Sequence, residues 1–134
     1  MTINLHYDSL FPSLFKTTLN AFKAGAKEIG KSILMDMIFA FKKTNTDLKK
    51  ILIEIEKNPN KALELDTIEF HDDMLKLEDM LEAIVKNSTK HKEDSEVFIE
   101  LYSIADELYT ITIKLGMTVS TTAIKLRHEL ERAS

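Results

Sequence analysis

Residues 25–32 read GAKEIGKS and match the G-x-x-x-x-G-K-S pattern of phosphate-binding loops. In such a loop the glycines let backbone amides surround the phosphates, and the lysine contacts the β- and γ-phosphates. A working loop follows a buried parallel strand and leads into a helix whose N-terminus faces the phosphates. The residues before this segment, LFKTTLNAFKA (14–24), have helical spacing instead.

No set of strands is available to build a parallel sheet around this segment. We therefore predict that the chain binds no nucleotide despite the Gly25–Ser32 match. Gly25 and Gly30 are interpreted as small residues at a close helix contact or at a helix break. Lys27 and Lys31 are expected to form a solvated row, one helical turn apart.

A second candidate for chemistry is the segment EFHDD, which holds three acids and a histidine within Glu69–Asp73. Carboxylate and imidazole groups are common ligands of divalent cations, but a metal site needs ligands that converge from several elements. The chain contains no Glu-x-x-His motif of the kind that builds di-iron bundles. We expect Glu69–Asp73 to be a charged, solvated helix face, and we predict no metal site.

Residues for other kinds of catalysis are scarce. The chain has no cysteine, which excludes thiol nucleophiles, thiolate zinc sites and disulfides. No serine stands in a Gly-x-Ser-x-Gly turn. Acidic residues are so frequent that no single carboxylate pair is informative. We predict that the protein is not an enzyme and has neither catalytic residues nor a cofactor.

Apolar residues in the first half of the chain recur at steps of three and four. This spacing predicts helices over roughly 10–29 and 32–57, or one long helix broken near Thr44-Asn45-Thr46. The run ILIEIE (51–56) alternates like a strand, but its flanking residues favour helix. Asn58-Pro59-Asn60 should end this part of the chain.

The second half also has helical periodicity. Asp66 and Glu69 resemble a capping box at the start of one helix. The polar run NSTKHKEDS (87–95) is expected to be a loop, and Asp94 or Ser95 should cap the next helix. That helix either ends at Gly116, with a last helix over about 118–132, or runs straight through.

Only three glycines and two prolines occur in 134 residues, too few for a chain with many tight turns. We predict a single domain over residues 1–134. Its fold class is all-α, an antiparallel up-and-down bundle of four to five helices.

Charge is distributed unevenly along the chain. Residues 10–43 carry six lysines against two acids, whereas residues 64–107 carry fourteen acids against four lysines. We expect the basic face of one copy, which holds several phenylalanines, to contact the acidic face of another in a salt-dependent way. The acidic segment disfavours nucleic acid, and the apolar run ILMDMIFAF (33–41) is too short to span a membrane.

The segment ADELYTITIKLG (105–116) resembles, in spacing, the phosphoacceptor segment of histidine-phosphotransfer domains. Ala105, Leu108, Leu115 and Gly116 match, but Asp106 stands where that family has its phosphorylated histidine. The similarity covers twelve residues and does not assign the chain to the family. It would imply a docking module without phosphotransfer.

These observations favour a cytoplasmic protein that acts through protein–protein interaction, as a self-associating subunit, adaptor or accessory factor. The expected partner is protein, with a homo-oligomer as the expected assembly. The alternative is a ligand-binding or enzymatic bundle that holds a divalent metal or a phosphate-containing ligand, at Glu69–Asp73 or near Lys27 and Lys31.

Overall fold

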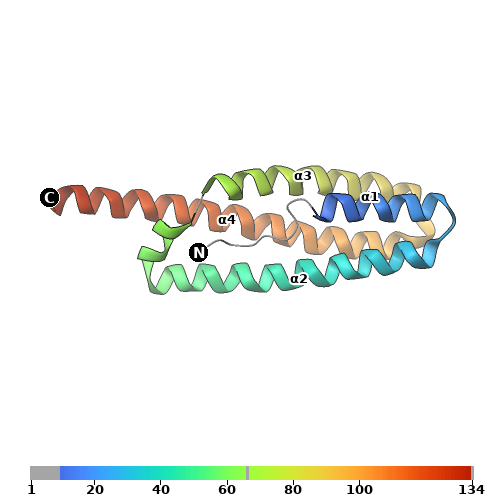
Figure 1. Cartoon of the computed structure of the whole chain (residues 1–134), viewed down its shortest axis with the longest axis horizontal. Helices are drawn as coiled ribbons and strands as arrows, with labels where there is room; N and C mark the ends of the chain where they lie inside the picture. Colours follow the sequence, from blue (N-terminus) through green and yellow to red (C-terminus); the bar gives the residue numbers. More distant parts are fainter. Residues whose placement is uncertain (1–9, 66, 134) are drawn as a thin grey trace.

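The computed structural model describes residues 10–65 and 67–133, with the side chains of all of these except 10–12, 67–71 and 73. Within these residues the chain forms four α-helices and two short 3-10 helices, and no strand (Figure 1). The elements, in chain order, are α1 (Leu10–Lys23), α2 (Lys27–Lys57), η1 (Pro59–Glu64), α3 (Thr67–Lys90), η2 (Lys92–Asp94) and α4 (Ser95–Ala133). The prediction of an all-α bundle is confirmed.

Consecutive α-helices alternate in direction and form two hairpins, α1–α2 and α3–α4 (Figure 1). The hairpins meet along α2 and α4, which pack side by side. Ion pairs between these two helices advance in the same order on both, from Lys42–Glu100 to Lys49–Glu107. Helices α2 and α4 are therefore parallel neighbours, while each hairpin is antiparallel.

The core lies between the hairpins and is built from the apolar stripe of each helix. Leu34, Met37 and Phe41 of α2 are fully buried, as are Leu101 and Leu108 of α4. Burial of such side chains is the main favourable term in folding.

The break between α1 and α2 lies at Gly25, earlier than the predicted boundary near residue 30. Gly25 has φ of +81°, a conformation that favours glycine. The amide of Gly25 donates to the Phe22 carbonyl (3.1 Å) and that of Ala26 to the Ala21 carbonyl (2.9 Å). These are the two bonds of a Schellman C-cap, which ends α1 and starts a new helical phase. In this new phase Ile29 is 60% exposed.

The alternative of one long helix broken near Thr44-Asn45-Thr46 is wrong, because α2 continues through these residues to Lys57. The hydroxyl of Thr44 donates to the Ala40 carbonyl and that of Thr46 to the Lys42 carbonyl, so both are satisfied inside the helix. The helical interpretation of residues 51–56 and the end of this helix before Pro59 are confirmed.

The polar run 87–95 is mostly helix, which corrects the predicted loop. Three polar side chains hydrogen-bond back to carbonyls of α3, namely those of Asn87, Ser88 and Thr89. They extend α3 to Lys90 and leave a connection of a few residues. The proposed capping role of Asp66 lies outside the described residues.

Helix α4 runs through Gly116 without a break, as the second of the two sequence alternatives has it. Its last buried residue is Ala123. Residues 124–133, here called the α4 arm, project past the ends of α2 and α3 (Figure 1). At 1.5 Å per residue the arm is roughly 15 Å long.

Candidate functional site

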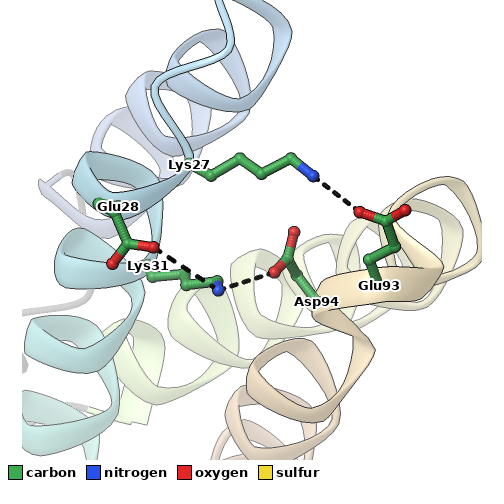
Figure 2. Close-up of polar contacts among 5 residues, drawn as sticks. All are labelled: Lys27, Glu28, Lys31, Glu93 and Asp94. Carbon is green, nitrogen blue, oxygen red and sulfur yellow. Dashed lines mark hydrogen bonds and ion pairs between the residues drawn. The ribbon is translucent and has the colours of Figure 1, made fainter.

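The Gly25–Ser32 segment spans the α1–α2 turn and the first turn of α2, and it faces η2 at the same end of the bundle. Two basic residues of α2 point toward two acidic residues of η2, with Glu28 beside them (Figure 2). We call Lys27, Glu28, Lys31, Glu93 and Asp94 the turn cluster. It joins the two hairpins at their turns.

Each lysine of the turn cluster has a carboxylate partner. Lys27 Nζ donates to Glu93 Oε2 at 2.9 Å. Lys31 Nζ lies 3.0 Å from Asp94 Oδ1 and 4.0 Å from Glu28 Oε1. The Asp94 side chain is only 7% exposed, whereas that of Glu93 is 84% exposed. Both lysines remain solvated, as predicted, with side chains 50% and 37% exposed, but each is also paired with a carboxylate, which the sequence analysis did not predict.

The pairing shifts the protonation equilibria toward the charged forms. The hydrogen bond to Asp94 raises the pKa of Lys31 above its ordinary 10.5, and the bond to Glu93 raises that of Lys27. The bond from Lys27 lowers the pKa of Glu93 below its ordinary 4.5. The two lysine pairs therefore stabilise the fold fully below pH 10.5, and this stabilisation is lost as the pH rises above that value. The Glu93 contribution is complete above pH 4.5 and is lost as the pH falls below that value. Between these limits neither lysine is a base.

Three backbone amides of the segment already have an acceptor. The amides of Gly25 and Ala26 close the end of α1, and the amide of Gly30 donates to the Ala26 carbonyl at 3.1 Å. A phosphate loop instead keeps its amides free for the ligand and follows a strand. Here the segment follows helix α1, and carboxylates hold both lysine ammonium groups. These features support the prediction that no nucleotide binds.

The substitution Lys31→Ala tests that prediction. Isothermal titration of the wild-type protein with ATP or GTP and magnesium should give no binding heat, and the variant should behave identically. In a real phosphate loop the lysine contacts the β- and γ-phosphates, so its loss would abolish binding. Micromolar binding to the wild type that disappears in Lys31→Ala would restore the phosphate-loop interpretation.

Beneath the turn cluster three rings from three elements meet. Phe22 of α1 lies 5.1 Å from the ring of His91 and 5.6 Å from that of Phe98, between ring centroids. His91 stacks on Phe98 at 5.8 Å, with 12° between the ring planes. The rings hold α1, the connection between α3 and η2, and the start of α4 together, and His91 packs as an aromatic residue.

Gly30 is where α2 approaches this aromatic cluster. A Cβ atom on Gly30 would lie 2.9 Å from Phe22 Cε2 and 3.0 Å from Cδ2. The Phe22 ring is buried between its neighbours and has little room to move. Of the two interpretations of these glycines, the structure shows a helix break at Gly25 and a close helix contact at Gly30.

Gly30→Ala is expected to destabilise the protein by about 1–2 kcal/mol through overpacking, measured by urea denaturation. In an ordinary helix interior the same change stabilises by about 1 kcal/mol. The control is Gly30→Ala in a Phe22→Leu background, where the ring edge is gone and the effect should become neutral or favourable. Stabilisation by Gly30→Ala in the wild-type background would contradict the close contact.

A surface pocket of about 420 Å³ opens beside the turn cluster. It is lined by Lys27, Thr89, Lys90, His91, Lys92, Glu93 and Asp94. Its charges of opposite sign largely offset one another, and Lys27 is already bound to Glu93. Lys27 is the residue that α2 contributes to this pocket, and because it is paired, α2 supplies the pocket with no unpaired charged group.

The other sequence candidates do not join this site. For Glu69–Asp73, the side chains of Glu69, His71 and Asp73 lie outside the described residues, and Asp72 is exposed. Among the described side chains, no group of three or more histidines and acids could hold a metal ion. Asp106 is exposed on α4, whereas Ala105, Leu108 and Leu115 are core residues.

Sequence reasoning missed the ion pairs that connect the basic and acidic halves of the chain. Lys42 lies 3.7 Å from Glu100, and Lys49 lies 2.9 Å from Glu107. With the turn cluster, these pairs line the contact between α2 and the η2–α4 segment. Three of the six lysines in residues 10–43 are therefore paired inside the chain. The uneven charge was the available signal, but it was interpreted as a contact between two copies.

Within the described part of the chain, no helix combines the length and apolar content that crossing a bilayer requires. Comparison of the chain with protein-family models, curated proteins and solved structures finds no match.

Proposed function

We propose that this chain is a non-catalytic helical-bundle protein that acts through protein–protein contact, as a self-associating subunit, adaptor or accessory factor. The cysteine-free composition suits a reducing compartment, and we propose a cytoplasmic location. The paired lysines of the turn cluster and the bonded amides of Gly25, Ala26 and Gly30 support a structural role for that region.

The observation that carries the proposal is the α4 arm. Leu130 is 64% exposed and Ile124 is 52% exposed, on a helix segment that leaves the body of the bundle. Leu130 shares its face of the helix with Leu126, and exposed apolar side chains on a projecting element are typical of interaction surfaces. The described residues of α4 after Leu126 are all exposed and add little to the core of a monomer.

The structure changes which surface we propose for self-association. The contact expected from the sequence used the lysines of residues 10–43 and several phenylalanines. Half of those lysines are paired inside the chain, and Phe15, Phe22 and Phe41 are core residues, which leaves Phe39 as the exposed one among the described phenylalanines of this segment. The side chain of Phe11 lies outside the described residues. We therefore place the self-association contact on the arm, where apolar contact dominates and salt has little effect.

Sedimentation equilibrium at tens of micromolar protein, in low and high salt, tests this proposal. The wild-type protein should form an oligomer at both salt concentrations. Replacing both Leu126 and Leu130 by serine should weaken association at least roughly 100-fold, because several apolar side chains per dimer are lost.

The matched control replaces Met35 and Phe39, which are 48% and 73% exposed on the outer face of α2, by serine. It removes a comparable exposed apolar surface away from the arm, and association should persist. A wild-type protein that is monomeric at both salt concentrations would contradict self-association. An oligomer that dissociates in high salt would favour the contact between oppositely charged faces.

A further inference from the structure

We infer that the outer face of the α3–α4 hairpin binds a basic amphipathic helix of another protein. This hairpin face consists of Glu78 and Val85 of α3 and of an outer stripe on α4, on a different side of the helix from its core residues. The face is separate from the α4 arm, so the inference does not depend on self-association. The outer stripe repeats at steps of three and four residues and consists of Ile99, Tyr102, Asp106, Tyr109, Ile113 and Met117.

The outer stripe is apolar or aromatic at every position except Asp106. Ile99, Tyr102 and Met117 are exposed, although the core face of the same helix is already packed against α2, α3 and η1. A surface helix normally carries polar residues on its outer side, whereas a helix that is apolar on several sides is typical of one that is buried. Within the described residues, the outer stripe is therefore an apolar face with no helix packed over it.

Helix α3 widens this face, because it runs antiparallel to α4 and packs along it (Figure 1). Burial raises the pKa of the Tyr109 phenol above its ordinary 10.0, and so does the carboxylate of Glu78 on α3, which therefore lies beside it. About two helical turns nearer the connection between these helices, Val85 of α3 and Tyr102 of α4 lie at the same level and on the same side. Both are exposed, so the two helices form one face.

The charge of the hairpin face selects its partner. The parts of α3 and α4 that form it, residues 74–85 and 99–113, hold six acids and one lysine. Glu100 and Glu107 pair with lysines of α2, which leaves four acids against that one lysine. Cationic side chains complement such a surface, whereas the phosphates of nucleic acids and anionic lipids are repelled.

The shape of the face fits a helix. From Ile99 to Met117 the outer stripe is roughly 27 Å long at 1.5 Å per residue, so a partner helix of about 18 residues covers it. The apolar side of that helix packs on the stripe, and its lysines or arginines lie along the edges. Asp106 is exposed near the middle of the stripe, where it pairs with a cation at the centre of the partner's apolar side.

Fluorescence anisotropy with labelled synthetic peptides tests the inference on the full chain. The probe is a helical peptide of about 18 residues made of leucine and lysine, with leucine on one side and one lysine at the centre of that side. We expect the wild-type protein to bind it, and Asp106→Lys should weaken binding at least about tenfold. A second peptide, with glutamate in place of the central lysine, should bind Asp106→Lys more tightly than it binds the wild type.

Asp36→Lys is the matched control, because it makes the same change at an exposed acid of α2, and it should leave binding unchanged. The double substitution Ile99→Ser and Met117→Ser tests the apolar contact and should also weaken binding at least about tenfold. All four side chains are exposed, and circular dichroism verifies that every variant is folded.

A wild-type protein that does not bind the leucine–lysine peptide would overturn the inference, as would equal weakening by Asp36→Lys and Asp106→Lys. Loss of self-association in Asp106→Lys would assign the hairpin face to a second copy of the chain instead. Binding of the wild type to phosphatidylglycerol vesicles, lost in the Ile99→Ser and Met117→Ser variant, would assign it to a membrane. A monomeric protein that binds the peptide as expected would contradict self-association and leave this inference standing.

Discussion

Replacing Phe98 by alanine is expected to lower the free energy of unfolding by about 3–5 kcal/mol. Phe98 is fully buried at the start of α4, where its ring contacts those of Phe22 and His91. The truncation leaves a cavity at the junction of three elements and removes the aromatic contacts as well. A loss of this size is a large fraction of the ~5–15 kcal/mol that stabilises a typical domain.

Phe39→Ala is the matched control, because it makes the same chemical change at a side chain that is 73% exposed. Its effect should stay within about 0.5 kcal/mol, as for most surface substitutions. Both variants are compared with the wild type by guanidinium denaturation at one protein concentration. Equal effects of the two substitutions would show that the aromatic cluster at the turn end does not anchor α4.

The helices were predictable because their signal is local. Steps of three and four between apolar residues identify a helix wherever it packs, and Pro59 prevents α2 from continuing. The breaks were harder to place. Whether Gly25 or Gly30 ends a helix depends on which one adopts a positive φ, and the sequence does not distinguish them. Gly25 adopts it, whereas Gly30 stays helical beside the Phe22 ring.

Polar residues led to two wrong predictions, a helix break near Thr44-Asn45-Thr46 and a loop over residues 87–95. Thr44, Thr46 and the residues 87–89 are frequent in loops, since their side chains compete for backbone hydrogen bonds. In this structure the same side chains bond to carbonyls of their own helix and cause no break. Composition cannot distinguish the two outcomes, because both satisfy the polar group.

The turn cluster could not be predicted from the sequence, because it is formed by residues that are far apart in the chain. The pattern of residues 25–32 attracts attention to Lys31, but only the folded chain brings Asp94 to within 3.0 Å of it. The pairing of α2 with α4 as parallel neighbours is likewise non-local. Uneven charge indicated that the two halves attract each other, without indicating whether the contact lies within one chain or between two.

A second large effect is expected at Asn45, in the contact between α2 and α4. Asn45 lies on the same face as Lys42 and Lys49, which pair with α4 on either side of it. It is 3% exposed, and within the described residues neither its Oδ1 nor its Nδ2 has a hydrogen-bond partner. A buried polar group without a partner costs about 1–3 kcal/mol.

Asn45→Leu should therefore raise the free energy of unfolding by about 1–3 kcal/mol, measured by urea denaturation and by thermal unfolding. Asn45→Ala removes the amide without adding volume, so it should be nearly neutral and shows whether the leucine is overpacked. Thr44→Val is the control for a satisfied group, because the Thr44 hydroxyl already donates to the Ala40 carbonyl.

The same substitution tests why a polar residue stands in this contact. A buried asparagine between parallel helices can fix their register at the expense of stability, because a shifted register would bury the amide in a worse place. Asn45→Leu should then be more stable but less uniform, with extra or broadened amide peaks in a two-dimensional NMR spectrum. A variant that is more stable and keeps a single set of sharp peaks would assign the register to the ion pairs that flank Asn45. Destabilisation by both Asn45→Leu and Asn45→Ala would instead show that the amide is satisfied by an internal water molecule.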